Sequence, residues 1–209
     1  MRIAIIGSGD LGRQIAHLIH QDTDDQVIGF FDDFETKGTI IRGIPILGNR
    51  TDVCVAFDNA VFDATVIAIG YKHLHIRKEV FDDLEGKVQF YTFIHSSCII
   101  DPTARIEEGT ILFPGCLIDQ NVHIHANSIL NIGCTVAHDT IIASHCFLAP
   151  RVAIAGVVKV GLCCIIGINA TIIDNLEIVS YVQIGAGSVV IKPIVKFGLY
   201  VGVPARFVK

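Results

Sequence analysis

The chain has 209 residues, of which 51% are hydrophobic and 18% charged, and its formal net charge is −5. The abundance of Ile and Val predicts a fold built mostly of strands, and it excludes a disordered chain, a coiled coil and a helical bundle. The acidic balance does not favour nucleic acid as a partner.

The hydrophobic content does not indicate a membrane protein. The longest uncharged stretch near the middle, residues 160–173, is shorter than the roughly 18 apolar residues that a spanning helix needs. The first residues resemble a strand rather than a signal peptide. We therefore expect a soluble cytoplasmic protein. The seven Cys residues include no C-x-x-C pair, so neither a disulfide framework nor a zinc site is expected.

Strands and helices are predicted to alternate over residues 1–93. Four apolar runs predict strands, and two segments have helical spacing: residues 3–6, 27–31, 65–69 and 88–91 for the strands, and 13–19 and 73–84 for the helices. Such alternation predicts a small parallel sheet. We place a domain boundary near residue 93.

The first strand leads into a glycine-rich loop. Gly7, Gly9 and Gly12 precede the first helix, and Asp32 ends the next strand twenty residues later. This spacing matches the dinucleotide fingerprint, in which glycines approach a pyrophosphate and the carboxylate accepts a ribose hydroxyl. About ninety residues are too few for two mononucleotide-binding halves, so a nucleotide carrying a group other than nicotinamide fits better. A tight turn without a ligand is the alternative.

A six-residue repeat dominates residues 94–209. Every sixth residue from Ile94 to Val190 is Ile, Leu or Val, without one insertion, and small or aliphatic residues follow four positions later. A hexapeptide period predicts a parallel β-helix, whose short strands form flat walls. The pattern resembles the β-helix of hexapeptide-repeat acyltransferases, in which three hexads complete one coil, so residues eighteen apart would lie above one another.

The eighteen-residue step makes further predictions. It stacks Cys98, Cys116 and Cys134 in one inward column and Cys146 with Cys164 in another, as small buried side chains rather than nucleophiles. The same step joins no His of the repeat to another His, so no metal site is expected within one subunit.

His138 and Asp139 are the candidate catalytic pair of the repeat. A β-helix wall needs no imidazole, and His is the side chain most easily used as a base near neutral pH. Two neighbouring residues on a straight strand point to opposite sides, so a hydrogen bond between His138 and Asp139 requires a corner there. A solvated His without a catalytic role is the alternative. His123, His125 and His145 are interpreted in that way.

Several sequence motifs resemble the NeuD/PglD family of sugar acetyltransferases. They are I-I-G-S-G-D-L-G, G-F-F-D-D, A-I-G followed by I-R, the hexapeptide repeat with V-A-H-D, and a closing V-G-V-P-A-R. The resemblance covers essentially the whole chain. It implies a Rossmann-like nucleotide-sugar domain at residues 1–93 and a left-handed β-helix that binds acetyl-CoA at residues 94–209. It also implies a homotrimer with active sites at subunit interfaces.

The activity implied by the resemblance is acetyl transfer from acetyl-CoA to the 4-amino group of a nucleotide-linked 4-amino-4,6-dideoxy sugar, with UDP as the expected nucleotide. His138 would be the base and Asp139 its acidic partner. The residues implied to bind the nucleotide sugar are Gly7, Ser8, Gly9, Asp32, Asp33, Gly70, Arg77 and Asn131. No covalent intermediate and no metal are required.

The coenzyme site implied by the resemblance contains one departure. The Gly156 N–H would face the acetyl thioester, and Ile168 and Ala186 would lie along the pantetheine arm. Many members carry a second His nine residues after the catalytic His, where this chain has Phe147. The thioester carbonyl would then depend more on backbone donors. If the ring does not serve packing, restoring His should help activity or leave it unchanged.

Three other functions remain open from the sequence. O-acetylation of a sialic-acid-type sugar is the nearest alternative, because some members of the family act on a hydroxyl. The glycine loop also allows an NAD-linked oxidoreductase, and the fold allows a non-catalytic nucleotide-sugar-binding protein.

Overall fold

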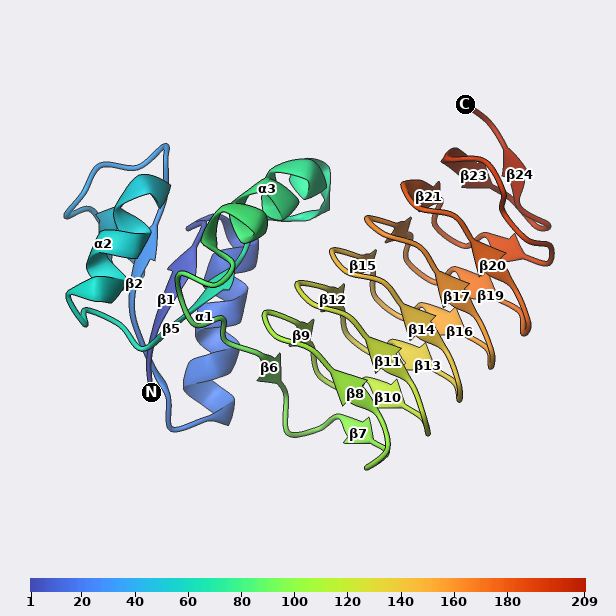
Figure 1. Ribbon diagram of the computed structural model, residues 1–209, viewed down its shortest axis with the longest axis horizontal. Helices are drawn as coiled ribbons and strands as arrows, with labels where there is room; N and C mark the ends of the chain where they lie inside the picture. The colour runs from blue at the N-terminus through green and yellow to red at the C-terminus, as the bar shows by residue number, and fades with distance from the viewer. The chain divides into compact units, whose positions relative to one another are not determined.

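The computed structural model describes residues 1–209, which divide into two compact units, Met1–Phe93 and Ile94–Lys209 (Figure 1). No helix in either unit combines the length and the hydropathy needed to span a bilayer.

The first unit contains a five-stranded sheet in the order β3-β4-β2-β1-β5. The strands are β1 (Arg2–Ile6), β2 (Gln26–Phe31), β3 (Ile40–Ile41), β4 (Ile44–Gly48) and β5 (Ala64–Ile67). All pairs are parallel except β3 with β4, so the predicted parallel sheet is confirmed. The helices are α1 (Asp10–Asp22), α2 (Val53–Asp58) and α3 (Leu74–Leu84), with 3₁₀ turns η1 (Arg50–Asp52) and η2 (Tyr71–His73).

Two features of this sheet differ from the prediction. The strand expected at residues 88–91 was wrong, because Phe90 forms only a single bridge to Thr65. The hairpin β3–β4 was missed. Its two-residue turn, Arg42-Gly43, has positive φ at both positions, 48° and 84°. Such turns usually carry Asn-Gly or Asp-Gly, so Arg at the first position hid the signal.

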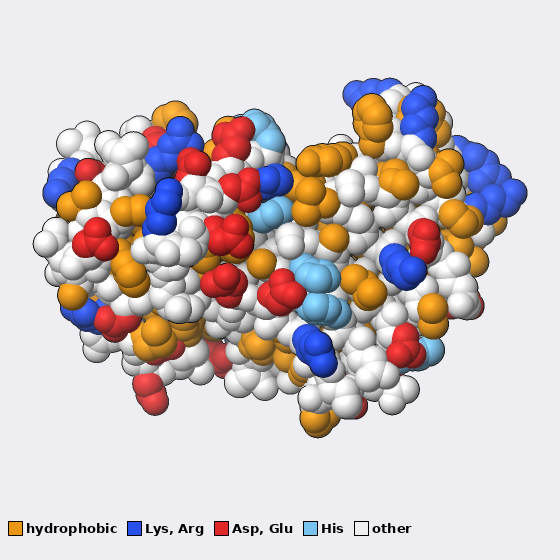
Figure 2. Space-filling view, viewed as in Figure 1, with side chains coloured by type: hydrophobic (Ala, Val, Ile, Leu, Met, Phe, Trp, Pro, Cys, Tyr) orange, Lys and Arg blue, Asp and Glu red, His pale blue; other side chains and the backbone are white.

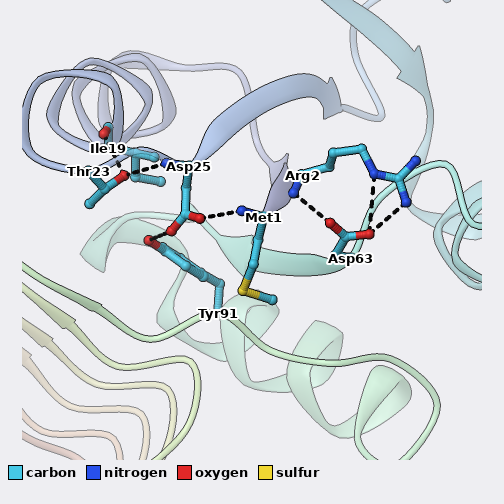
Figure 3. Close-up of polar contacts among 7 residues, drawn as sticks. All are labelled: Met1, Arg2, Ile19, Thr23, Asp25, Asp63 and Tyr91. Carbon is cyan, nitrogen blue, oxygen red and sulfur yellow. Dashed lines mark hydrogen bonds and ion pairs between the residues drawn. The ribbon is translucent and has the colours of Figure 1, made fainter.

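Polar contacts fix the start of β1 within the first unit (Figure 3). The amino group of Met1 pairs with Asp25, whose other oxygen accepts a 2.6 Å hydrogen bond from the Tyr91 hydroxyl. Asp63 accepts from the backbone and the guanidinium of Arg2 at 2.7 and 2.6 Å. Strand β1 is therefore held to the segments around Asp25 and Asp63 by polar contacts as well as by its place in the sheet.

The second unit is a three-walled parallel β-helix, as predicted. Wall 1 contains β7 (Ile99–Ile100), β10 (Leu117–Ile118), β13 (Thr135–Val136), β16 (Ala153–Ile154), β19 (Thr171–Ile172) and β22 (Val189–Val190). Wall 2 contains β8 (Arg105–Ile106), β11 (His123–Ile124), β14 (Ile141–Ile142), β17 (Lys159–Val160) and β20 (Glu177–Ile178). Wall 3 contains β6 (Phe93–Ile94), β9 (Ile111–Leu112), β12 (Ile129–Leu130), β15 (Phe147–Leu148), β18 (Ile165–Ile166), β21 (Val182–Ile184), β23 (Gly198–Val201) and the antiparallel β24 (Arg206–Phe207).

The register of the walls confirms the eighteen-residue coil. Leu117 pairs with Thr135, and His123 pairs with Ile141, each partner being eighteen residues further along the chain. Successive coils are visible in Figure 1 as stacked arrows coloured from green to red. A residue number in this unit therefore specifies both a wall and a level.

The repeated aliphatic residues form the core of the helix. Every sixth residue from Leu112 to Val190 is buried, whereas Ile94 is 38% exposed and Ile100 and Ile106 are half-buried. The first coil is therefore the least well covered part of the repeat. The predicted Cys columns are confirmed: Cys116, Cys134, Cys146 and Cys164 belong to this core, Cys98 packs against it, and all are free thiols.

Candidate functional site

His138 and Asp139 lie at the corner between wall 1 and wall 2, after β13 and before β14. Asp139 has a φ of 57°, which makes the corner that a contact between these neighbours requires. The two side chains meet with His138 Nδ1 2.9 Å from Asp139 Oδ2, and each is 47% exposed. The structure therefore brings together the pair that the sequence predicted, in a position open to a substrate.

The Asp139 carboxylate fixes how the imidazole can act. Hydrogen bonds from His138 and then from Asn121 lower the pKa of Asp139 below its ordinary value. An ionised carboxylate only accepts hydrogen bonds, so Nδ1 of His138 carries the proton and Nε2 keeps its lone pair. In this arrangement Nε2 could serve as a base, and the carboxylate would stabilise the imidazolium after proton transfer.

Asn121 is a third member of the cluster that the sequence reasoning missed. It lies eighteen residues before Asp139, one coil earlier at the same corner, and its amide donates to Asp139 Oδ1 at 3.0 Å. Its backbone N–H is held by the Thr103 hydroxyl at 2.8 Å. The eighteen-residue step applied to Asp139 would have found it.

Gly156 lies one coil beyond His138, and its missing side chain makes room for the imidazole. A Cβ built there would lie 2.6 Å from both Cε1 and Nε2 of His138. The coils are joined here by a 2.9 Å bond from the Val157 N–H to the His138 carbonyl. The Gly156 N–H donates to no group of the chain. Gly156 thus lies against the His138 imidazole, and its own N–H has no acceptor within the chain.

The other predicted residues of this unit lie elsewhere. Asn131, Ile168 and Ala186 follow strands of wall 3, so they occupy the corner between wall 3 and wall 1. Ile168 and Ala186 are both exposed and lie in adjacent coils, joined by a 2.8 Å bond from the Gly187 N–H to the Ile168 carbonyl. The full width of wall 1 separates them from His138 within one chain.

Phe147 is in β15 of wall 3, half a coil from His138. In a triangular coil, that wall faces away from the corner between walls 1 and 2. The ring is 7% exposed and lies between Ile129 and Ile165 in the wall's register. Phe147 is therefore a packing residue of its own chain, and it could meet His138 only in a second copy.

Phe147→His is expected to reduce stability by about 2 kcal/mol without raising kcat, because a polar ring replaces a buried apolar one. Chemical denaturation measures the loss. The matched control is Phe197→His, at a ring that is 69% exposed, which should change stability little. Unchanged stability at Phe147 together with a faster reaction would contradict the packing role.

Asn121→Ala is expected to lower kcat about tenfold at an unchanged KM for acetyl-CoA, because Asp139 loses one of its two side-chain donors and His138 is held less firmly. Asn175→Ala is the matched control. Asn175 has the same φ of 57° at the same corner three coils later, so the backbone strain is equal. Equal steady-state effects of the two substitutions would exclude a positioning role for Asn121.

The first unit contains a cavity of about 290 Å³ where the glycine loop meets the end of β2. The residues that line it are Ile6, Gly7, Phe31, Asp32, Asp33, Phe34, Arg50, Ile69, His73, Ile76 and Val80. Gly7 has a φ of 102°, and a Cβ on Gly12 would lie 2.0 Å from the Gly7 carbonyl oxygen. These two glycines therefore permit the tight turn and the close approach of α1, as the fingerprint requires.

Asp32 holds the glycine loop instead of standing free. Its Oδ2 accepts from the backbone N–H and the hydroxyl of Ser8 at 2.8 and 2.7 Å, and its Oδ1 accepts from the Phe34 N–H at 2.9 Å. Partial burial raises the pKa of Asp32, but these hydrogen bonds outweigh it and keep the pKa below its ordinary value. The ionised carboxylate keeps little spare capacity for a ribose hydroxyl.

The remaining predicted residues of the first unit have separate positions. Asp33 lines the cavity. Its Oδ1 accepts a 2.9 Å hydrogen bond from the backbone N–H of Arg50, and its Oδ2 lies 3.2 Å from Nε of Arg50. Gly9 precedes α1, and Gly70 precedes η2. Arg77 does not line the cavity. It is fully buried, donates to the Ile67 carbonyl at the end of β5, and burial lowers its pKa to about 9.

Comparison with known proteins found a family match for the first unit and similar solved structures for the whole chain. Residues 2–84 match the family described as the PglD N-terminal domain. Over 99% of its length the chain is similar to PerB from Caulobacter crescentus in complex with CoA and GDP-perosamine, at 25% identity, 96% coverage of that chain and a TM-score of 0.86.

Two further solved structures are similar over the whole chain. WeeI from Acinetobacter baumannii AYE is 27% identical, with all of both chains covered and a TM-score of 0.87. The acetyltransferase domain of PglB from Neisseria gonorrhoeae FA1090, in complex with acetyl coenzyme A, is 23% identical, with 99% of this chain and 98% of that chain covered and a TM-score of 0.87. The glycine loop, the hexapeptide β-helix and these matches make the chain similar to the NeuD/PglD family of sugar acetyltransferases, and its residues 2–84 match the family described as the PglD N-terminal domain.

Proposed function

We propose that this protein transfers the acetyl group of acetyl-CoA to the 4-amino group of a nucleotide-linked 4-amino-4,6-dideoxy sugar. The observation that carries the proposal is the arrangement at one corner of the β-helix, where the His138 imidazole is oriented by Asp139 and lies against Gly156, whose N–H donates to no group of the chain. PerB, at 25% identity, is described with CoA and GDP-perosamine, which supports the same two substrate classes.

The proposed reaction is a direct transfer in a ternary complex. The sugar amine attacks the thioester carbonyl carbon, and Nε2 of His138 takes the proton that the amine loses. The Gly156 N–H stabilises the oxyanion, and Asp139 stabilises the imidazolium. The C–S bond then breaks, the carbonyl re-forms as an amide, and the imidazolium returns its proton to the departing thiolate. Proton and electron pairs balance without a covalent enzyme intermediate.

The cavity of the first unit is proposed to hold the nucleotide part of the nucleotide-linked sugar. Gly7 brings backbone to its wall, the Asp33–Arg50 pair supplies both charges, and Phe34 is 97% exposed at its edge, where an aromatic ring can stack on a base. The family resemblance favours UDP, whereas PerB is described with a GDP-linked sugar. Both nucleotides must therefore be tested.

The complete site is proposed to need a second copy of the chain. Asn131, Ile168 and Ala186 occupy one corner of the β-helix and His138 another, and Phe147 lies on the wall opposite His138. A coenzyme that contacts both corners would lie between two subunits. A homotrimer with sites at its interfaces satisfies this requirement, and sedimentation equilibrium of the full chain tests it.

A substrate panel tests the proposed activity. UDP-, dTDP- and GDP-linked 4-amino sugars and sialic acid are each incubated with acetyl-CoA, and the released thiol and the acetylated product are measured. Thiol release only with sialic acid would replace the proposal with O-acetylation. No release with any acceptor, but stabilisation by a nucleotide sugar, would indicate a binding protein, and stabilisation by NAD alone would indicate an oxidoreductase.

Asp32→Ala is expected to raise KM for the nucleotide sugar at least about tenfold with a smaller effect on kcat, because Ser8 and Phe34 lose a charged acceptor and the loop loosens. Initial rates at varied sugar concentration measure it. The matched control is Asp63→Ala, which removes a carboxylate bound to Arg2, outside the cavity lining. An unchanged KM for Asp32→Ala would mean that the loop does not contact the substrate.

A further inference from the structure

Three potential metal ligands meet on wall 2, away from the catalytic corner. His123 is in β11 and His125 follows it, so the two side chains lie on the same outward face two residues apart. The parallel register pairs Arg105 with His123 and Ile106 with Ile124, which places Glu107 beside His125. Figure 2 shows a group of His side chains with an acidic side chain next to it on this face.

The donor atoms of these residues converge on one point. Glu107 Oε1 lies 2.7 Å from Nε2 of His123 and 3.0 Å from Nδ1 of His125, and the two imidazole rings are 3.9 Å apart between centroids. One donor atom from each residue lies within 4.8 Å of the others. The three side chains are 29–39% exposed, so an ion could enter and keep a water ligand.

We propose that Glu107, His123 and His125 bind a zinc ion. Two imidazole nitrogens and a carboxylate oxygen are donors that Zn²⁺ accepts in tetrahedral geometry, at about 2.0–2.2 Å from the metal. Donors around such an ion are a little over 3 Å apart, so the present separations need only small side-chain rotations. Strand pairing fixes the backbone of all three residues, so binding orders few groups.

A hydrogen bond to the second carboxylate oxygen of Glu107 already orients this residue as a metal ligand. Its Oε2 accepts a 3.0 Å hydrogen bond from the Ala126 N–H, which leaves Oε1 turned toward the two imidazoles. Partial burial raises the pKa of Glu107, but the contacts with His123, His125 and Ala126 lower it overall. The carboxylate is therefore ionised at neutral pH, as a metal ligand must be.

The proposed role of the ion is to fasten the first coil to the second. Glu107 belongs to the first coil, where Ile100 and Ile106 are only half-buried, and both His residues belong to the second coil. The cluster precedes the corner between walls 2 and 3, whereas His138 occupies the corner between walls 1 and 2. The ion would therefore stabilise the helix and take no part in acetyl transfer.

The expectation that no metal site exists within one subunit followed from stepping eighteen residues from one His to another. The partner eighteen residues before His125 is a carboxylate, Glu107, which that search did not include. His123 joins the same pair from two positions along the strand. The alternative without a metal is a carboxylate shared by two imidazoles.

Zinc binding is tested with the full chain, free of any His tag and stripped of metal with a chelator. Competition with a chromophoric chelator should give one Zn²⁺ per chain, and added Zn²⁺ should raise the Tm. Glu107→Gln and His123→Gln should each weaken binding by about tenfold or more and remove the Tm increase.

Two controls make the result decisive. His20→Gln changes an exposed His of α1, outside the cluster, and should bind like the unmodified chain. Co²⁺ in place of Zn²⁺ should give visible absorption that is lost in Glu107→Gln, independent of stability or activity. Absence of stoichiometric binding by the unmodified chain, or equal binding by all variants, would overturn the proposal in favour of the metal-free His pair.

Discussion

His138→Ala is expected to lower kcat by at least about a hundredfold, because the amine would lose the base that accepts its proton. KM for both substrates should change little, since the proposed mechanism places the imidazole at the reacting atoms and not at the nucleotide. Steady-state rates with the accepted sugar measure both constants. Residual turnover is expected, because the Gly156 N–H and the binding of two substrates remain.

The control for this substitution is His20→Ala, which removes an exposed imidazole from α1 and should leave kcat unchanged. Near-normal turnover of His138→Ala would remove it as the base and reassign the corner to a structural role.

Gly156→Ala is expected to lower kcat about a hundredfold while leaving the Tm nearly unchanged. The added methyl carbon would lie 2.6 Å from Nε2 of His138, so the imidazole must move away from the acetyl group, and a shift of about 1 Å costs roughly this factor. Gly156 is not one of the residues with positive φ, so Ala adds no backbone strain. Kinetics and thermal unfolding of the same sample separate the two effects.

A double-mutant cycle tests the cause of that loss. If Gly156→Ala acts by displacing the imidazole, then His138→Ala combined with Gly156→Ala should be about as slow as His138→Ala alone. Losses that multiply would instead mean that the methyl group blocks the coenzyme or its oxyanion. A normal kcat for Gly156→Ala would show that the His138 imidazole can move without loss of activity, and that its contact with Gly156 has no catalytic importance.

The sequence predicted the β-helix well because each hexad repeats the same physical requirement. An aliphatic residue must face a narrow core at every sixth position, so the period from Ile94 to Val190 specifies wall and level together. The first unit was less predictable. Short strands such as Ile40–Ile41 contain too few residues for an alternation of apolar and polar side chains to appear. The run Val88–Tyr91 is apolar because its apolar side chains are largely buried, and only Phe90 forms a bridge to a neighbouring strand.

The candidate site was predicted in its parts but not in its connections. His138 and Asp139 stand out as residues that a wall does not need, whereas Asn121 resembles an ordinary corner residue until the coil places it against Asp139. Asp32 was singled out as a partner of the nucleotide, whereas its hydrogen bonds to Ser8 and Phe34 depend on how the loop folds over the strand end. Arg77 was expected near the substrate, and its burial comes from packing of α3 that charge alone does not reveal.

The unbroken eighteen-residue coil limits which insertions and deletions this enzyme can accept. His138 and Gly156 meet only because eighteen residues separate them. Losing one hexad between them would turn every later residue by one wall, so Gly156 would arrive at a different corner and another residue would face the imidazole. Losing a whole coil would keep the walls but bring Asp174 to that place. Insertions and deletions should therefore be harmless only outside the span from Asn121 to Gly156. Within that span, the sequence can diverge only by substitution.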